Sequence, residues 1–592
     1  MILQALTQYY EDLLRLGKIN RPGWSKQKVS YSLLLSEEGE LLQLLHLQQE
    51  VQRGNKTVLG PQEMWVPSPV KRSSGIRPNF LCDTSSYLLG VDGKGKADRS
   101  IDCFAASKAL HLQLLREVDS PIARAIVRFF ERWDPSQAAN HPALQEDWEE
   151  LLKGGNLTFS LDKQFAAQDP AIADAWTRHY EDSSDDAEPI RCLVTGQTGT
   201  LARLHPSIKG VAGAQSSGAS LVSFNAPAFC SFEHEQGANA PVSDYAAFAY
   251  TTALNTLLAD RNRVSRVGDT TILCWAAGGE SAYQDCFLMS IFDDSYTEND
   301  ILNTLHHLSK GESIQWDDTK LSPDTRFYVL GLAPNAARLS VRFFWQNSFG
   351  ALARNLERHY QRLEIIRPSF DKFPTLPIWR LVLETVRKAP PGGRTPEPHP
   401  RLAGDLLLAV LNDTLYPATL LNGVELRIRA ERSVSRGQAA ILKAYYTKYL
   451  EQFQPDSPMK EALTVELNEQ TNYLPYVLGR LFAVMEGLQQ SANPGINTTI
   501  KDRYFNSASA TPLLVFPILR NLAIKHLEKL KKMGENEKKL AFFYEKKIIE
   551  LNGRTKVTFP ARMSLAEQNY FQLGYYHETQ RRYTAKTNKE EQ

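Results

Sequence analysis

A stretch rich in proline and glycine at residues 389–400 constrains the fold of this chain more than any other feature. Such a stretch disfavours both helix and sheet, so it marks an exposed boundary or a linker. Beyond it, apolar residues recur with helical spacing and strand signals are few, whereas short strand-like runs alternate with helical patterns before it. The sequence therefore predicts an α+β chain, in which a mixed, multi-domain N-terminal region with short strands precedes an all-α C-terminal helical bundle.

This division predicts three regions. Residues 1–375 are expected to form the mixed region, residues 376–458 a helical connector that contains the 389–400 linker, and residues 459–592 the bundle. The spacing of apolar residues also predicts the individual helices. They are expected at 1–18, 103–118, 120–133, 244–259, 298–309, 402–412, 434–454, 459–490, 512–533, 535–551 and 564–584.

Turn residues between apolar runs predict three hairpins in the mixed region. The first joins strands 28–35 and 41–47 around Gly39, and the second joins 191–194 and 200–204 through the turn 195–199. The third lies within 325–344, with its turn at 333–337. Short strands are also expected at 80–81 and 87–89.

Composition and charge limit the classes of protein to which the chain can belong. Hydrophobic residues make up 42% and charged residues 23% of the 592-residue chain, which is ordinary for a soluble globular protein. Glu11 and Asp12 interrupt the N-terminal apolar stretch where a signal peptide would continue, and no run is long enough to span a membrane. Six cysteines without a CxxC pair favour a reduced, cytoplasmic protein with no thiolate zinc site, and no cofactor is expected.

The segment from Arg203 to Asn225 combines glycines with short polar side chains and one lysine. It contains Lys209, Gly210, Gly213, Gln215, Ser216, Ser217, Gly218 and Asn225. Glycine lets backbone approach a ligand closely, and the amides and hydroxyls supply donors and acceptors. This inventory suits a polyanion or a base edge, and an unpartnered surface loop is the plain alternative.

Further basic groups lie outside this segment, although the net charge of the chain is only +1. Lys71 and Arg72 lie in a loop rich in Ser, Gly and Pro, where cations can lie along phosphates, and the amides of Asn79 and Asn239 can contact base edges. From Arg520 onward the chain contains 16 Lys and Arg but only 9 Asp and Glu, and aromatic residues alternate with the cations. We predict contacts to the nucleic-acid backbone for Arg77, Arg261, Arg263, Arg266, Arg427, Arg429, Lys546 and Lys547.

No catalytic constellation is recognisable, and we expect no enzyme and no metal site. Ser216 and Ser217 lie in a sequence similar to a nucleophile elbow, but Ala214 breaks the GxSxG spacing. Two alternatives to nucleic-acid binding stay open. One is a serine hydrolase that uses either serine, which a fluorophosphonate probe would label. The other is a helical protein–protein interaction scaffold, for which no salt-dependent DNA binding is expected.

Several long blocks of the chain resemble the large subunit of the type I-C CRISPR Cascade interference complex. In order, they are Phe80–Gly90, Leu193–Gly196, Arg203–Asn225, Gln236–Ser243, Tyr250–Leu258, Leu330–Phe343, Asn468–Gln489 and Tyr504–Pro512. They extend over nearly the whole chain, so the resemblance is specific.

The resemblance implies a non-catalytic reader of DNA. Such a subunit inspects the short protospacer-adjacent motif of duplex DNA, typically TTC in this family, and wedges the strands apart at its edge. The guide RNA then pairs with the target strand, and a recruited helicase-nuclease cuts. The implied partners are guide RNA, target double-stranded DNA, the backbone and 5′-handle-capping subunits, small-subunit copies and the helicase-nuclease. Region 1–375 would recognise the motif and contact the guide handle.

The resemblance and the residue chemistry together suggest individual roles. Gln215, between two glycines, is the candidate wedge or base contact, with Lys209, Ser216 and Ser217 on phosphate or minor-groove edges beside it. Asn79, Lys71 and Arg72 form a second group, and Asn225 and Asn239 a third. The family also makes its C-terminal part separately as a small subunit, for which Met459 is the expected internal start.

Overall fold

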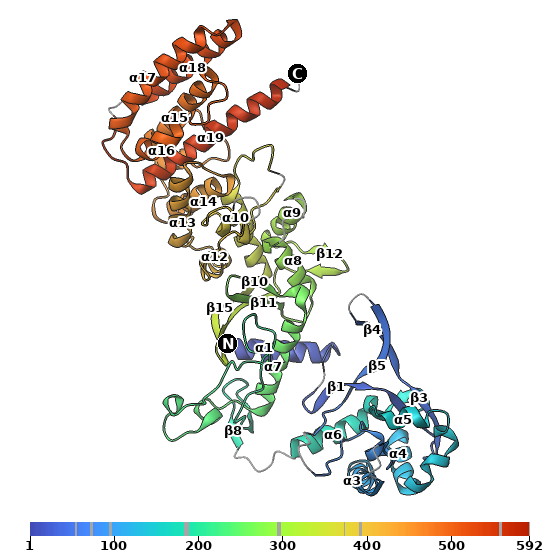
Figure 1. Cartoon of the computed structure of the whole chain (residues 1–592). Coiled ribbons are helices and arrows are strands. Elements are labelled where there is room, and N and C mark those ends of the chain that lie inside the picture. The colour runs from blue at the N-terminus through green and yellow to red at the C-terminus, as the bar shows by residue number, and fades with distance from the viewer. Residues whose placement is uncertain are drawn as a thin grey trace. The chain divides into compact units, whose positions relative to one another are not determined.

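The computed structural model describes residues 1–19, 21–53, 56–70, 75–93, 97–182, 189–292, 298–371, 373–389, 393–555 and 559–590. The chain divides into two compact units. Unit 1 comprises Met1–Pro206 and Ser223–Ala253, and unit 2 comprises Ser207–Val222 and Leu254–Gln592. The expected fold class is confirmed, because small sheets alternate with helices in the N-terminal part, whereas α10 to α19 form a region of helices (Figure 1). The division at 375 and 458 stays a prediction.

Unit 1 contains three small sheets and the helices that cover them. Its strands pair in the orders β1-β5-β4, β3-β2-β6-β7 and β8-β9. The strands are β1 Trp24–Val29, β2 Tyr31–Leu35, β3 Leu41–His46, β4 Gln48–Arg53, β5 Lys56–Pro67, β6 Leu157–Leu161, β7 Gln164–Phe165, β8 Pro189–Arg191 and β9 Thr198–Thr200. The helices are α1 Ile2–Arg15, α2 Ser85–Leu88, α3 Ala97–Leu115, α4 Pro121–Arg132, α5 Trp148–Lys153, α6 Pro170–Asp182 and the first part of α7 Asp244–Ala259.

The hairpin β2–β3 and helix α4 share one core in unit 1. The hairpin is antiparallel as predicted, and β2 continues the sheet through parallel pairing with β6. Helix α4 begins with Pro121 at its first turn, where the missing N–H costs nothing. Its apolar residues recur at helical spacing, so Ile126, Phe129 and Phe130 are buried together against Phe159 of β6.

Unit 2 begins with a four-stranded antiparallel sheet of order β10-β11-β14-β15, beside the two-stranded ribbon β12-β13. Every residue of the central strand β11 is buried, which explains its continuous apolar run. The strands are β10 Ser265–Val267, β11 Thr270–Ala276, β12 Ile314–Trp316, β13 Thr319–Leu321, β14 Arg326–Asn335 and β15 Arg338–Ser348. The helices of this part are α8 Ala282–Phe292, α9 Glu298–Ser309 and α10 Phe349–Leu363.

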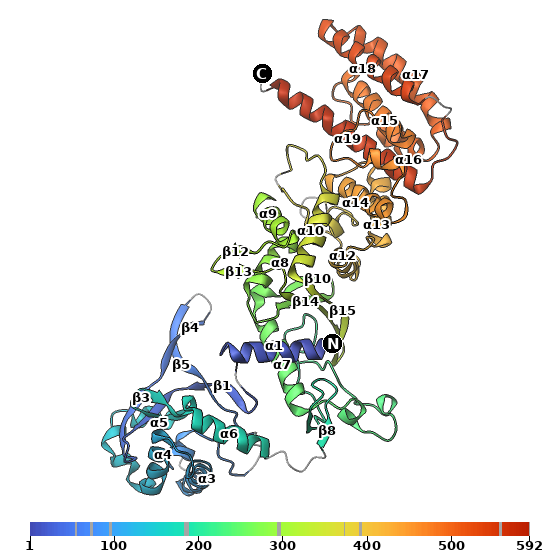
Figure 2. The ribbon, with the colours of Figure 1, turned by 180° about the vertical axis from the view of Figure 1, so that it is seen from behind.

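The C-terminal helices pack around α15, most of whose residues are buried. Helix α15 lies between the pair α17–α18 and helix α19 in both views (Figures 1 and 2). The helices are α11 Ile378–Leu383, α12 Leu402–Leu411, α13 Ala418–Glu431, α14 Arg436–Phe453, α15 Leu474–Ala492, α16 Ile500–Ala510, α17 Pro512–Lys531, α18 Glu535–Arg554 and α19 Leu565–Glu590. None of the helices described is long and apolar enough to cross a bilayer.

Four predictions of local structure were wrong. No strand forms at 80–81, where Leu81 has φ +59°. The expected strand 87–89 belongs largely to α2, which Thr84 precedes at the N-cap position. The helix expected over 459–490 begins at Leu474, because the β-branched and Asn residues before Pro475 favour turns. The second hairpin exists, but its strands β8 and β9 lie two or more residues before the expected positions. The third hairpin, β14–β15, is confirmed.

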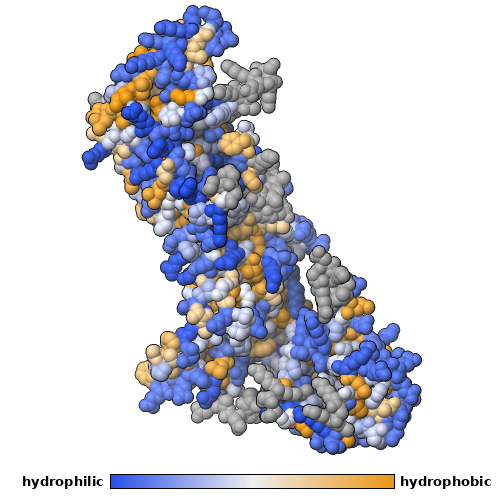
Figure 3. Space-filling view, in the orientation of Figure 1, coloured by the Kyte–Doolittle hydropathy of each residue, from blue (hydrophilic) through white to orange (hydrophobic). Residues whose placement is uncertain are grey.

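Exposed apolar side chains lie on α17 and α18, although the two helices also contribute to the core. Orange residues mark this part of the bundle in Figure 3. The most exposed of them are Leu514, Ile524, Phe542, Phe543 and Ile549. Both helices thus expose apolar side chains that they do not bury in the core.

Three buried histidines predict a loss of stability in mild acid. Burial lowers the pKa of His111 to about 4 and the pKa values of His359 and His577 to about 3, from the usual 6.5. The unfolded chain therefore binds more protons than the folded chain between about pH 4 and pH 6.5, so stability rises with pH across this window. At about pH 5 each histidine is expected to lower the free energy of unfolding by about 2 kcal/mol relative to pH 7.5.

Urea unfolding at the two pH values measures this effect. The His577→Gln variant, in which an amide replaces the ring that contacts the Tyr476 hydroxyl (2.7 Å), should show a smaller difference between the two pH values than the parent chain. Equal unfolding free energies of the parent chain at both pH values would contradict the prediction.

Candidate nucleic-acid interface

The Gly/Ser-rich segment at 207–222 forms a loop that is fastened at several points within unit 2. Ile208 and Ala219 exchange two backbone hydrogen bonds of 2.9 and 2.8 Å, which close the loop at its base. Ser220 donates to the Ala337 carbonyl and accepts from Leu339, at the turn between β14 and β15. The backbone N–H of Ala212 donates to Thr271 Oγ1 (3.1 Å). The neighbouring sheet thus fixes the backbone of the loop, and the buried side chains of Ile208 and Val211 also anchor it.

Asn255 of α7 holds the other side of the loop. Its Oδ1 accepts from the backbone N–H of Lys209 (2.9 Å), and its Nδ2 donates to the Ser207 carbonyl (3.1 Å). Both ends of one amide are therefore used to fix the backbone on either side of Ile208. The side chain of Lys209 remains exposed.

Close backbone approach explains two of the glycines. Gly218 has φ +105°, and an added Cβ would lie 2.8 Å from the Cβ of Ser207. Gly210 has φ +95°, and its Cβ would lie 3.2 Å from the side chain of Leu258. An L side chain at either position would be strained by its φ and crowded by its neighbour. These glycines let the two sides of the loop and α7 pack closely.

A hollow of about 1120 Å³ opens beside this loop. It is lined by Ser207, Lys209, Gly210, Ser217, Asn255, Leu258, Ala259, Arg261 and Val264. Lys209 and Arg261 are the two charged groups of this lining, and no carboxylate belongs to it. The cations form no ion pair among the described residues, so their charge is available to an anion.

The predicted wedge residue lies at the tip of the loop. The backbone N–H of Gly218 donates to the Gln215 carbonyl (3.0 Å), which closes a turn over Ser216 and Ser217. All three side chains of this turn are exposed, and Ser217 also lines the hollow. The structure thus brings Lys209, Ser217 and Arg261 together, with Gln215 on the adjoining turn.

Several of the other predicted cations are already engaged. Arg263 binds Asp285 through two hydrogen bonds (2.8 and 3.0 Å) and Asp260 through a third (2.6 Å), and these contacts raise its pKa further. Arg427 pairs with Glu431 one turn away on α13.

The remaining predicted cations fall into two groups. Arg429 donates to Gln568 Oε1, and Lys547 pairs with Glu469 and Glu550. The side chains of Arg266 and Lys546 are exposed, and Arg266 donates to the Gly268 carbonyl. Arg266 and Lys546 therefore offer their charge to solvent more fully than the paired cations do.

The predicted residues of unit 1 lie in other loops. Asn79 Oδ1 accepts from the backbone N–H of Val70 (3.0 Å), and Asn239 accepts from Ser231 and donates to two carbonyls of its own loop. Both amides therefore fasten the loops that carry them. Arg77 and Asn225 are exposed. Lys71 and Arg72 lie outside the described residues.

Asn255 was not among the site residues predicted from the sequence. Its signal is a lone amide in the otherwise apolar second half of α7, where Leu254, Leu257 and Leu258 are buried. A polar side chain at such a position needs a partner, and here the partner is the backbone of the candidate loop.

The serine alternative finds no support in the arrangement of the loop. Among the described residues, no hydrogen bond joins Ser216 or Ser217 to a histidine or a carboxylate, which a nucleophilic serine requires. The ring of His205 is bonded instead to the Tyr250 hydroxyl (2.7 Å), and burial lowers its pKa. No group of His, Cys, Asp or Glu suited to a metal ion occurs in the described part of the chain.

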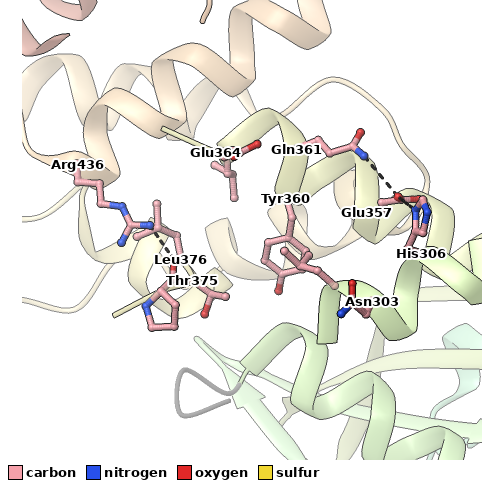
Figure 4. A pocket seen from close by; sticks show the side chains of 12 residues that line it. Asn303, His306, Glu357, Tyr360, Gln361, Glu364, Thr375, Leu376 and Arg436 are labelled. Carbon is pink, nitrogen blue, oxygen red and sulfur yellow. Dashed lines mark hydrogen bonds and ion pairs between the residues drawn. The ribbon is translucent and has the colours of Figure 1, made fainter. Parts of the chain in front are cut away.

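A second hollow, of about 380 Å³, lies between α9, α10 and the segment before α11 (Figure 4). His306 Nδ1 lies 2.7 Å from Glu357 Oε1 at one side, and Tyr360 donates to the Ser290 carbonyl. The buried Thr375 Oγ1 and Arg436 Nε have no hydrogen-bond partner in the described structure. Its lining mixes both charges with apolar groups, unlike the hollow at Lys209.

The open hollow beside the fixed polar loop offers two cations and short polar groups, which suit an anionic group. A comparison with known families gives the family. The family model described as "CRISPR-associated protein (Cas_Csd1)" matches residues 6–583, so the chain belongs to this family of type I-C large subunits. Membership implies a part in Cascade-based interference. No curated protein matches the chain.

Proposed function

We propose that this chain is the non-catalytic subunit that recognises the protospacer-adjacent motif in duplex DNA and starts strand separation at its edge. Lys209 and Arg261 would neutralise phosphates, Ser217 would donate to the same strand, and Gln215 would contact or displace the base pair beside the motif. The guide RNA would then pair with the opened target strand, and the chain would help to recruit the helicase-nuclease.

The single observation that carries this proposal is the acid-free pair of cations beside an exposed turn whose backbone is fixed. A duplex presents phosphates on its outside and base edges within its grooves, so a reader needs cations and short polar groups side by side. Asn255 and the β14–β15 turn fix the loop before DNA arrives, which lowers the ordering cost of binding.

Replacing Lys209 by alanine tests the phosphate contact. We expect weaker binding of motif-containing duplex by the assembled complex, and a salt dependence whose slope falls by about 1, the value for one lost phosphate contact. The matched control is Lys320→Ala, which removes an exposed lysine of β13 outside the hollow. Equal salt slopes for all three proteins, measured by anisotropy, would refute the assigned contact.

Replacing Gln215 by alanine tests strand separation separately from binding. Permanganate reactivity of thymines beside the motif should fall, whereas a target that is already unpaired there should bind as tightly as before. A Gln215→Ala complex that keeps full target binding and opening would exclude Gln215 as the wedge.

We also propose Met459 as the internal start of a separately made small subunit. Met459 lies in a short turn, Pro458–Ala462, and its own backbone N–H donates to the capping residue Ser457 (Oγ, 3.4 Å). The product would contain α15 to α19, which share one core. Mass spectrometry of a purified complex should find a fragment that begins at Met459, and a fragment with another N-terminus would exclude it.

A further inference from the structure

Exposed aromatic side chains gather around a hollow at the beginning of α11, which the proposed function does not use. The hollow has a volume of about 750 Å³. Phe370, Phe373 and Trp379 line it with 81%, 40% and 39% of their surface exposed. Side chains of this size and polarity are normally buried, so three exposed ones around one hollow indicate a binding surface.

The aromatic groups are held in place by the local fold. Helix α11 buries Ile378, Leu381 and Val382, so Trp379 and Arg380 lie on its outer side. Arg436 braces the preceding segment through the carbonyls of Phe373 (2.6 Å) and Pro374 (2.8 Å). The platform is therefore formed before any ligand binds, which lowers the entropy cost of binding.

The charges around the hollow leave two cations available. Arg380 places its guanidinium carbon 3.6 Å from the centre of the Phe373 ring and 5.6 Å from that of Trp379. A guanidinium stacked in this way keeps its charge and several donors for another partner. Lys388 is exposed at the same hollow. In the described structure, neither Arg380 nor Lys388 forms an ion pair.

The acidic groups of the lining are already engaged. Asp371 pairs with Arg436 (3.1 Å), and Glu384 accepts a hydrogen bond from Ser435 Oγ (2.7 Å). The hydroxyl of Ser435 does not neutralise Glu384, so Arg380, Lys388 and Arg436 against Asp371 and Glu384 leave the lining a net charge of +1 beside open aromatic faces.

We propose that this hollow binds an unpaired stretch of a nucleic-acid strand. Bases stack on Phe370 and Trp379, and phosphates lie against Arg380 and Lys388. Aromatic faces accept any base, and cations beside them follow the backbone, which is the combination used by proteins that bind single strands. A proline-rich peptide also binds aromatic grooves, but it does not require cations such as Arg380 and Lys388, which form no ion pair in the described structure. The hollow shares no residue with the one at Lys209, so either site can fail without the other.

Photochemical cross-linking of the full chain tests the site directly. The probe is a short oligothymidylate in which 5-iodouracil replaces some thymines, irradiated in complex with the unmodified protein. Stacked aromatic side chains should give cross-links in the peptide that contains Phe370, Phe373 and Trp379. Cross-links confined to other peptides would overturn the proposal, and this readout does not depend on the folding of a variant.

A double variant, Phe370→Ala with Trp379→Ala, tests the energetic contribution. Single-strand affinity should fall at least about tenfold, because each stacked base is worth roughly 1–3 kcal/mol and about 1.4 kcal/mol corresponds to tenfold. Trp379→Phe should restore most of the affinity, since it keeps an aromatic face. Phe453→Ala, which removes a 54% exposed aromatic side chain of α14 outside the hollow, should have no effect.

Two other results would overturn the proposal. One is unchanged single-strand affinity in a double variant that melts like the parent chain. The other is displacement of the oligothymidylate by a proline-rich peptide, together with loss of the cross-links at Trp379. A control peptide without proline, at the same concentration, should have no effect. That result would assign the hollow to a peptide. Affinity for blunt duplex should stay within about twofold in the double variant, because paired bases cannot stack on the platform.

Discussion

A Gly479→Ala variant is expected to lose much of the stability of the C-terminal helices. An added Cβ would overlap the carbonyl oxygen of Phe571 and lie 2.8 Å from its carbon and 2.9 Å from the nitrogen of Tyr575. These atoms belong to the backbone of α19, which cannot move aside as a flexible side chain could. Forcing a methyl group into such a contact is expected to lower the free energy of unfolding by about 3 kcal/mol, which is the upper end of the usual range for overpacking a core.

The reciprocal contact makes the crossing of α15 and α19 unusually close. Gly574 of α19 faces the Tyr476 carbonyl of α15, and an added Cβ would lie 3.0 Å from the carbonyl carbon. Each helix thus offers a glycine to the backbone of the other, and separating them for one methyl group would loosen the shared core.

Urea unfolding with a matched control measures the effect. Gly553 lies within α18 and an added Cβ would meet nothing within 4 Å, so Gly553→Ala should stabilise by about 0.5–1 kcal/mol through helix propensity. The free energy of unfolding is expected to fall in Gly479→Ala and to rise in Gly553→Ala. A stabilising Gly479→Ala would contradict the close crossing of the two helices.

The second large effect concerns an ion pair within the same crossing. Arg480 and Glu578 are 0% and 4% exposed, and Arg480 Nε donates to Glu578 Oε2 at 3.0 Å. Glu578→Gln would leave the guanidinium charge buried without its counter-charge, which costs about 3–5 kcal/mol. An exposed pair offers the control, because Glu535→Gln removes the partner of Lys538 and should cost at most about 1 kcal/mol.

A double-mutant cycle separates the interaction energy of Arg480 with Glu578 from the cost of burying either charge alone. Arg480→Met and Glu578→Leu together should be less destabilising than the sum of the two single changes, because neither charge is then left alone. Additive free energies of unfolding would mean that the two side chains do not interact in solution.

Helices of the C-terminal region were the most predictable part of the fold. Those around 402–412, 512–533 and 564–584 begin within two residues of the expected positions, because proline or a turn precedes each apolar repeat. The expected helix from 459 was wrong because apolar residues at 463–474 pack without helical backbone: Val465 instead accepts a backbone hydrogen bond from Ile366. Such tertiary pairing leaves no periodic signal in the sequence.

For the site, the sequence indicated which residue types gather but not which of them are free to bind. Lys209, Ser217 and Arg261 line one hollow, although Arg261 was predicted in a group separate from Lys209 and Ser217. Arg263 follows Arg261 by two positions, yet it is bound by two carboxylates, one of them 22 residues away on α8. Charge spacing along the chain does not show whether a carboxylate from another element will compensate an arginine.

The fastening of the candidate loop has a consequence for synthesis on the ribosome. Ser220 bonds to Ala337 and Leu339, which are translated long after it. The loop therefore cannot reach its fixed form until β14 and the beginning of β15 have left the exit tunnel. A nascent chain that stalls before residue 339 would carry the residues of the candidate loop without the hydrogen bonds that fix its backbone.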